Sequence, residues 1–254
     1  MTNGLFMSIT TKRTLLGVLT PSSNTALEPL TSSMLNNLPL VTSHFSRFRV
    51  TRISLDDRDL GQFNHTAPLE ASDLLADARM DVIGWSGTAA GWLGFDHDVQ
   101  LCQAIEARTG IRATSSILAL NEVLNSMGVK RFGLVSPYTS DVQDCIIRNY
   151  QDIGIECVAE SHLDLSENFS FSEVDEIALS RQVAAVAAKK PDAIVLYCTN
   201  LRSAHLASQW EQEFGIPVID TTSTVVWKML SMAGHNPAAV VGWGRFFQEA
   251  SAHV

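Results

Sequence analysis

Three segments of this chain recur later in the sequence, in the same order. The matched pairs are residues 16–23 with 132–139, residues 81–88 with 192–199, and residues 110–116 with 215–221. Their offsets shrink slowly, from 116 to 111 to 105 residues, and in the first pair both the Gly and the Pro positions coincide. Chance could supply one such match, but three in order are much harder to obtain that way. A chain with this internal repeat is expected to fold into two similar halves.

The hydrophobic pattern indicates what each half contains. Short apolar runs alternate with helical segments, which is typical of βαβ units and a mostly parallel sheet. The predicted strands are 14–19, 46–53, 81–85, 131–136, 156–160 and 192–197, and the predicted helices are 25–35, 69–79, 99–108, 141–153, 175–188 and 203–214. The sequence thus predicts an α/β fold of two halves, each a mostly parallel sheet flanked by helices. Residues 12–115 plus 225–254 would form one half, and residues 116–224 the other.

The ends of the repeated strands predict where a site would lie. Each repeated segment ends its strand with small polar residues. In open parallel sheets, ligands bind beyond the carboxyl ends of the strands. Two such edges facing each other would build one small-molecule pocket in the cleft between the halves.

Charge and hydropathy narrow the range of partners. The chain has 18 Lys and Arg against 27 Asp and Glu, a formal net charge of −9, and no basic cluster, so we expect no nucleic-acid partner. No apolar run approaches the ~20 residues that span a bilayer, so we expect no membrane partner. Residues 1–11 lack the long apolar stretch of a signal peptide and are expected to form a loose leader. A cytoplasmic location is therefore predicted.

Of the four cysteines, Cys198 has the most informative position. None of the cysteines or histidines has a metal-binding spacing, so we expect no metal site. Cys198 directly follows the predicted strand 192–197, and Thr199 and Asn200 could cap the helix after it. Backbone N–H groups at a helix start lower a thiol's pKa, which suits a proton donor or a nucleophile. The alternative is an inert buried thiol, as expected for the other three cysteines.

Other candidate residues lie in the loops after the predicted strands. Residues 21–25 are dense in hydroxyl and amide groups, although such residues also favour helix N-caps. Tyr138 lies in the equivalent loop of the second half, where a Tyr is more often at the surface or partly in the core. Residues 87–91 echo the Cys198 loop, and they could present backbone N–H groups to a carboxylate or form a plain turn. Trp85, Ala89, Ala90 and Trp92 could line an apolar pocket or belong to ordinary core.

Several of these motifs resemble one known family. The motifs are residues 21–25, 136–138, 197–199 and the closing stretch 242–247, Gly-Trp-Gly-Arg-Phe-Phe. They are similar to the maleate cis-trans isomerase and arylmalonate decarboxylase branch of the aspartate/glutamate racemase superfamily, over almost the whole chain. The resemblance implies two flavodoxin-like halves around a pseudo-twofold axis. It also implies a small carboxylate or dicarboxylate substrate, no metal, no organic cofactor and a possible homo-oligomer.

The resemblance also implies roles for particular residues. Isomerases and racemases of the superfamily place two cysteines across the substrate, one from each half. Cys198 matches the second, whereas Gly87 stands at the position of the first, as in arylmalonate decarboxylase. Asn24 and, more loosely, Asn168 match substrate-carboxylate ligands of the isomerases, and Tyr138 matches a substrate-binding Tyr of both enzymes. The full set of candidate substrate-binding residues is Ser22, Ser23, Asn24, Thr88, Ala89, Tyr138, Asn168, Thr199 and Asn200.

The missing first cysteine is compatible with three hypotheses. The leading one is a cofactor-independent decarboxylase of an aryl- or alkyl-substituted malonate-like diacid, because decarboxylation needs only one acid, Cys198, to protonate an enediolate. We expect the pKa of this thiol to be tuned toward neutrality. The second hypothesis is a maleate isomerase or racemase-like enzyme with a replaced first base. The third is a catalytically silent protein that binds a small carboxylate.

Overall fold

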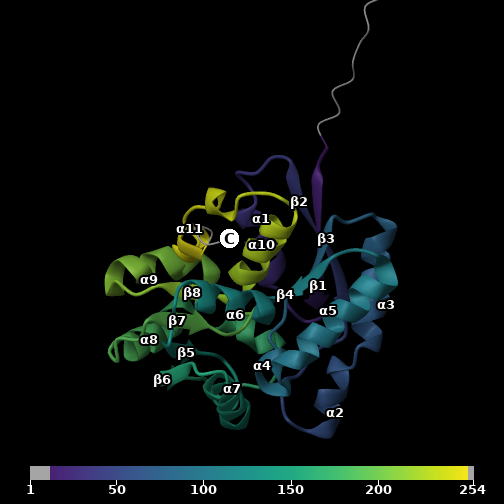
Figure 1. The fold of residues 1–254 in the computed structure, drawn as a ribbon. Coiled ribbons are helices and arrows are strands. Elements are labelled where there is room, and N and C mark those ends of the chain that lie inside the picture. The colour runs from purple at the N-terminus through teal and green to yellow at the C-terminus, as the bar shows by residue number, and fades with distance from the viewer. Residues whose placement is uncertain (1–11, 251–254) are drawn as a thin grey trace, which may run out of the picture.

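The computed structural model describes residues 12–250, and it consists of two four-stranded parallel sheets. The strand orders are β2-β1-β3-β4 and β6-β5-β7-β8, so each sheet has the flavodoxin-like order. In Figure 1 the first sheet lies to the right and the second to the lower left. The first sheet contains β1 (Thr14–Pro21), β2 (Val41–Phe48), β3 (Val82–Trp85) and β4 (Ala113–Ser115), and the second contains β5 (Arg131–Val135), β6 (Glu156–Ser161), β7 (Ala193–Leu196) and β8 (Val218–Asp220).

The repeat found in the sequence corresponds to equivalent strands of the two sheets. Its three matched pairs fall on β1 and β5, on β3 and β7, and on β4 and β8. The predicted fold class is therefore confirmed. The leader predicted for residues 1–11 lies outside the described residues.

Helices connect the strands and cover the sheets. The α-helices are α1 (Leu27–Met34), α2 (Asp57–Leu60), α3 (Thr66–Asp77), α4 (Ala90–Leu93), α5 (Phe95–Thr109), α6 (Ser116–Ser126), α7 (Ser140–Asp152), α8 (Glu176–Ala187), α9 (Ala207–Phe214), α10 (Thr221–Met232) and α11 (Phe246–Glu249). Single 3₁₀ turns are η1 (Gly61–Phe63), η2 (Phe169–Glu173), η3 (Ala204–Leu206) and η4 (Pro237–Ala239). No helix among residues 12–250 is both long and apolar enough to cross a membrane.

The second strand differs from its prediction. The sequence predicts a strand at 46–53, whereas β2 spans Val41–Phe48. The apolar residues Val50 and Ile53 are buried, but they lie beyond the sheet in a segment whose other residues, such as Arg49 and Arg52, are exposed. Their hydrophobicity therefore reflects burial over the site described below and not pairing within the sheet.

The helices α6 and α10, which the sequence does not predict, join the two halves. Nine of the twelve residues of α10 are buried, so it lacks the one-sided apolar pattern of a surface helix. It packs on α6 and α1 and contacts β3, β4 and β8, at the junction of the two sheets (Figure 1). A Cβ at Gly84 would collide with Val225 and Met229, so glycine in β3 is what permits this close packing.

The C-terminal segment docks on the second half. The backbone N–H of Arg245 donates to the Glu211 carboxylate of α9, at 3.0 and 3.1 Å, and Arg245 Nη2 donates to the carbonyl of Gly215. Since α10 contacts both sheets, the assignment of residues 225–254 to the first half stays a prediction.

Candidate active site

Loops from both sheets meet in one small cavity, at the carboxyl ends of the strands where the sequence predicts a site. Its volume is about 20 Å³, room for about one water molecule. The lining contains no charged side chain. It consists of Pro21, Val50, Ile53, Phe63, Trp85, Gly87, Thr88, Ala89, Trp92, Tyr138, Asn168, Cys198 and Thr199.

Cys198 lies immediately beyond β7 and is 2% exposed. Its sulfur accepts a hydrogen bond from the backbone N–H of Asn200 at 3.4 Å and interacts with the hydroxyl of Tyr138. Burial raises the pKa of the Cys198 thiol to about 12, although both hydrogen bonds oppose the shift. The expectation of a pKa near neutrality is therefore wrong, and at neutral pH the resting group is a thiol that carries its proton.

The predicted helix 203–214 is found as η3 and α9, but the expectation that Thr199 and Asn200 cap it is wrong. Thr199 and Asn200 belong to a turn, and α9 begins only at Ala207. The helix that follows Cys198 therefore does not begin beside the sulfur, where it would lower the pKa of the thiol.

The side chain of Asn200 points toward the other half instead. Its Oδ1 accepts hydrogen bonds from the backbone N–H of Thr25 at 3.0 Å and of Ala26 at 3.3 Å, and its Nδ2 donates to the carbonyl of Asn168. Asn200 is 1% exposed and is not among the cavity-lining residues. It therefore joins the loops around the site without facing the cavity.

Tyr138 links the two halves inside the cavity. Its hydroxyl lies 2.6 Å from Thr88 Oγ1, and burial raises the pKa of the phenol well above its usual value. Its ring packs edge-on against Trp92 and Phe171. A neutral hydroxyl held in this way can donate to an oxygen of a bound carboxylate and also contact the Cys198 sulfur.

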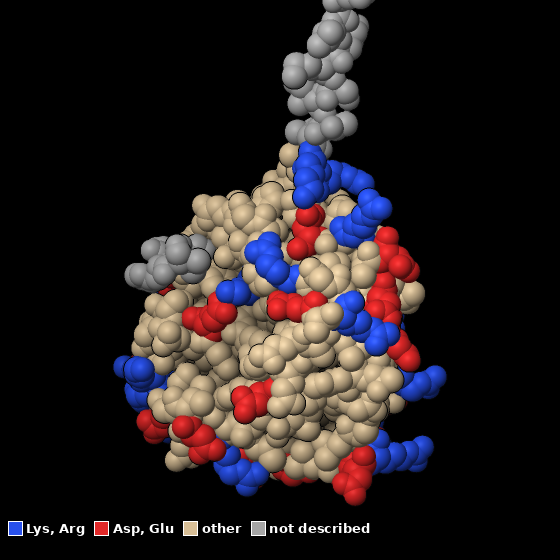
Figure 2. Space-filling view, turned by 45° about the vertical axis from the view of Figure 1, so that its right-hand side comes forward, with Lys and Arg blue, Asp and Glu red and all other residues tan. Residues whose placement is uncertain are grey.

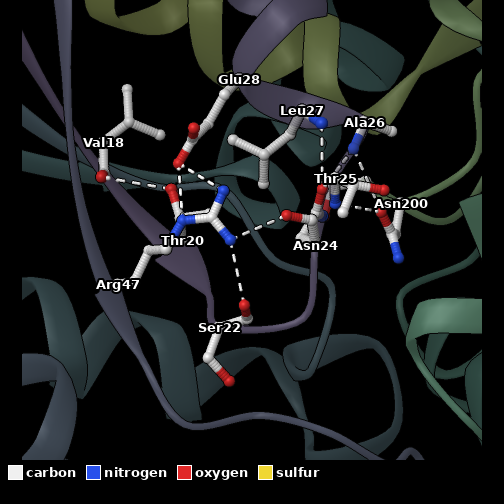
Figure 3. A network of polar contacts seen from close by, with 11 residues as sticks. Val18, Thr20, Ser22, Asn24, Thr25, Ala26, Leu27, Glu28, Arg47 and Asn200 are labelled. Atoms are coloured by element: carbon white, nitrogen blue, oxygen red, sulfur yellow. Dashed lines mark hydrogen bonds and ion pairs between the residues drawn. The ribbon is translucent and has the colours of Figure 1, made fainter.

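Asn24 has another role in the described structure than the resemblance implies. Figure 3 shows its Oδ1 turned to the start of α1, where it accepts from the backbone N–H of Ala26 and of Leu27. Its Nδ2 donates to Thr199 Oγ1 at 3.3 Å. Asn24 does not line the cavity, so the helix-capping alternative describes its contacts.

Ser22 and Ser23 also make local hydrogen bonds. The hydroxyls of both contact the carbonyl of Val50, with Ser23 Oγ at 2.7 Å. Asn168 does line the cavity, and its Nδ2 donates to Ser23 Oγ at 2.8 Å. The two serines therefore lie behind the cavity wall and hold Val50 and Asn168 in place.

Arg47 is a residue that the sequence analysis missed. From β2, its Nη1 donates to the carbonyls of Ser22 and Asn24, each at 3.0 Å, and its guanidinium pairs with Glu28 (Figure 3). It thereby fixes the loop after β1. A lone Arg in a strand carries no signal of this role, since the contact depends on the pairing of β2 with β1.

Gly87 faces the same cavity as Cys198, from the other half. The cavity wall on its side is apolar and contains Trp85, Trp92 and Ala89, whereas Ala90 is buried outside it. Ser86 is buried, and its carbonyl accepts from Thr199 Oγ1 at 3.2 Å. One aromatic wall thus stands opposite one thiol.

The cavity brings together part of the candidate set. The candidates that line it are Gly87, Thr88, Ala89, Tyr138, Asn168, Cys198 and Thr199. The candidates outside the lining are Ser22, Ser23, Asn24 and Asn200. The sequence analysis missed the lining residues Pro21, Val50, Ile53 and Phe63. Among residues 12–250 no group of acidic, His or Cys side chains could hold a metal ion.

Surface charges are mixed in sign, and one buried carboxylate, Asp220, lies close enough to Cys198 to act on its pKa. The face shown in Figure 2 carries interspersed acidic and basic side chains and no extended basic patch. A groove of about 560 Å³ over Arg49, Arg52 and Arg58 shares no lining residue with the cavity.

Comparison with known proteins gives relatives of two named activities. The maleate isomerase of Geobacillus stearothermophilus is 25% identical over 229 residues, 85% of this chain and 90% of its own. The arylmalonate decarboxylase of Bordetella bronchiseptica is 25% identical over 172 residues, 66% of this chain and 72% of its own. The crystal structure of the maleate isomerase Iso from Pseudomonas putida S16 superposes with a TM-score of 0.83 at 25% identity, covering 94% of this chain and 100% of that one.

A family model identifies the chain more directly. Residues 60–247, which include most of the cavity lining, match the model of arylmalonate decarboxylase. The chain is thus an enzyme that belongs to the arylmalonate decarboxylase family, in the branch of the aspartate/glutamate racemase superfamily shared with the maleate isomerases.

Proposed function

We propose that this enzyme decarboxylates a malonate-like diacid with an aryl or alkyl substituent, and that Cys198 protonates the product carbon. The observation that carries the proposal is the buried thiol of Cys198 in a cavity that Gly87 lines from the other half. Decarboxylation requires an acid on only one face of the substrate α-carbon. A thiol whose pKa is raised to about 12 holds the proton that this step consumes.

The reaction breaks one carbon–carbon bond. The bond between the α-carbon and one carboxylate cleaves, CO₂ leaves, and the electron pair is delocalised into the remaining carboxylate as an enediolate. Cys198 then transfers its thiol proton to the α-carbon, and the thiolate regains a proton from solvent. The product is a monoacid. The apolar wall of Trp85, Trp92 and Ala89 suits the departing group, because CO₂ is uncharged.

Donors in the cavity can stabilise the enediolate. The backbone N–H groups of Thr88 and Ala89 have no hydrogen-bond partner within residues 12–250, and the hydroxyls of Thr88 and Tyr138 lie beside them. Fixed donors aimed at a developing oxyanion are usually the largest electrostatic contribution to catalysis. Of the other candidates, Asn168 and Thr199 can add contacts from the second half, whereas Asn24 would have to leave the start of α1.

Maleate isomerisation is the second candidate function. Most of the curated relatives are named maleate isomerases, which favours it. Addition of a thiolate to the double bond needs a second sulfur to deliver the proton, and position 87 is a glycine. The Cys198 thiol is moreover protonated at neutral pH, so it suits proton donation better than attack.

A substrate panel tests these candidates. The purified chain is incubated in D₂O with phenylmalonate, methylphenylmalonate and maleate, and CO₂ release and product deuteration are followed. We expect CO₂ and an α-deuterated monoacid from a substituted malonate. Conversion of maleate to fumarate without malonate turnover would replace the proposal with the isomerase reading. Saturable binding of a diacid without any turnover would support a silent carboxylate-binding protein instead.

A cytoplasmic location and a homo-oligomeric state stay predictions. A small dicarboxylate is the partner that this proposal requires.

A further inference from the structure

The space beside Gly87, which lines the cavity together with Cys198, is filled by a neighbouring side chain. A Cβ atom built at Gly87 would fall within 3.0 Å of three atoms of the six-membered ring of Trp85, a spacing that real Cβ atoms do not show. We propose that Trp85 restricts this enzyme to protonation from the Cys198 face, because its indole occupies the volume of any side chain at position 87. This inference rests on the proposed function and adds the residue that enforces one-sided chemistry.

The backbone brings the indole to this place. Trp85 is the last residue of β3, and alternate residues of an extended segment point to the same side, so residues 85 and 87 share a side of the chain. The indole extends forward along that side and covers position 87. Position 87 requires glycine because the Trp85 ring lies so close to its backbone. It does not require glycine for its backbone conformation, since Gly87 is absent from the residues with positive φ.

The Trp85 ring has little freedom to move aside. It is 2% exposed, and its centroid lies 4.9 Å from that of Phe48, the last residue of β2. A packed ring cannot yield to a new side chain without displacing its neighbours. A thiol at position 87 therefore cannot reach the cavity while Trp85 is present.

Trp92 provides an internal comparison. It also lines the cavity, and its ring packs edge-on against Tyr138 with a centroid distance of 5.3 Å. It is not among the nearest neighbours of a Cβ at Gly87, all three of which belong to Trp85. Removal of Trp92 enlarges the same cavity without clearing the space at position 87.

A stability cycle tests the steric part without any substrate. We expect Gly87→Cys to lower Tm by roughly 3–10 °C in the natural sequence, because it overpacks the site. In a Trp85→Ala background the same substitution should cost less than half of that shift, and in a Trp92→Ala background it should cost the full shift. If Trp85→Ala does not fold, Trp85→Val serves, since valine suits a strand end and its side chain is too short to cover position 87.

Hydrogen exchange tests the chemical part. With a thiol at position 87 and Cys198 opposite, one sulfur can remove the α-proton of a 2-arylpropionate as the other returns a proton. We expect Trp85→Ala/Gly87→Cys to exchange this proton with D₂O at least tenfold faster than Gly87→Cys alone or Trp92→Ala/Gly87→Cys. Proton NMR on one enantiomer measures both exchange and racemisation.

The outcomes separate the inference from the proposed function. Equal Tm costs of Gly87→Cys in all backgrounds would overturn the steric role of Trp85, whatever the activities. Full exchange by the single Gly87→Cys variant would overturn it too. Coupled Tm values, with no decarboxylation by the natural sequence and no exchange by the double variant, would overturn the proposed chemistry and the reaction-restricting role but leave the packing of Trp85 on position 87 intact.

Discussion

At the scale of single residues, the proposed chemistry depends on the proton of the Cys198 thiol. Cys198→Ala removes the acid, and Cys198→Ser replaces it with a much weaker one. Since a positioned general acid contributes about 100- to 10,000-fold, we expect kcat for malonate decarboxylation to fall by that factor in Cys198→Ala. Circular dichroism and thermal unfolding should show a folded protein. Retention of more than a tenth of the activity by Cys198→Ala would exclude Cys198 as the proton donor.

Asp220 makes stability depend on pH in an uncommon direction. Burial raises the pKa of this carboxyl to about 6, although hydrogen bonds from Ser203 and Thr222 oppose the shift. The native state therefore holds the proton more tightly than the unfolded chain does. Its contribution is complete below the unfolded value of about 3.9 and is lost as pH rises through about 6.

Urea unfolding between pH 4.5 and 7.5 checks this linkage. Relative to Asp220→Asn, the natural sequence should lose about 2 kcal/mol of unfolding free energy as pH rises across this range. The comparison isolates Asp220, because other titrating groups are common to both proteins. A constant difference between the two proteins would show that Asp220 titrates at its ordinary pKa.

The sequence allows some residue roles to be predicted and hides others. Cys198 and Tyr138 are recognisable because they follow repeated strands and match family motifs, and both line the cavity. The loop after β1 is misleading for a physical reason: Asn24 has one amide, and here it caps α1 in place of facing a ligand. The covering of position 87 by Trp85 depends on ring packing, to which a sequence pattern is insensitive.

At the scale of elements, the segment between β2 and α3 covers the site. Val50, Ile53 and Phe63 line the cavity, whose volume is about 20 Å³, so the proposed function requires this segment to move when a substituted malonate enters. Its closed form is tied by Gln62, whose Oε1 accepts from the backbone N–H of Thr51 at 2.8 Å and whose Nε2 donates to the carbonyls of Arg52 and Asp59.

Removal of the Gln62 hydrogen bonds should affect closure of this segment over the substrate more than it affects the chemical step. We expect Gln62→Ala to raise KM by roughly 3- to 30-fold with a smaller change in kcat, because it removes two or three hydrogen bonds from the closed segment. Hydrogen–deuterium exchange should show faster exchange in residues 49–63. Asn64→Ala, which removes exposed hydrogen bonds just beyond the segment, is the matched control. Unchanged exchange in Gln62→Ala would contradict the proposed tie.

Strands are predicted correctly where burial within a sheet is the only cause of the apolar pattern in the sequence. The central strands β3 and β7 are completely buried and read as continuous apolar runs. The prediction fails for β2 because the apolar residues Val50 and Ile53 line the cavity and do not belong to the sheet. It fails for α10 because a helix that is buried on all sides has no periodic pattern of apolar and polar residues. The errors thus concentrate at the site and at the junction of the halves.

At the scale of the whole molecule, the two halves are held together through buried side chains around the site. Asn200 contributes most clearly, since it contacts Thr25 and Ala26 of the first half and Asn168 of the second. Thr88 and Tyr138 form a second bridge, and Asn24 and Thr199 a third. The alignment of the halves therefore depends on buried side chains at and around the cavity.

Loss of Asn200 should weaken the whole fold. Asn200→Ala removes three buried hydrogen bonds and leaves the backbone N–H of Thr25 without a partner, so we expect a loss of about 2–4 kcal/mol of unfolding free energy. The unfolding transition should stay single, because the halves also share the packing of α10. Asn236→Ala, which removes one exposed cap of η4, should cost less than about 1 kcal/mol. Equal costs for the two variants would refute the structural role of Asn200.

The neutral lining of the cavity also bears on the direction of the reaction. A doubly charged diacid that enters it gives up water of hydration and meets hydroxyls and amides but no cation. In the proposed decarboxylation, release of one carboxylate as uncharged CO₂ would remove half of that unfavourable charge while the molecule is still enclosed. The neutral lining would then raise the free energy of the starting diacid more than that of the singly charged product, so an environment that resists binding would also favour cleavage of the bond.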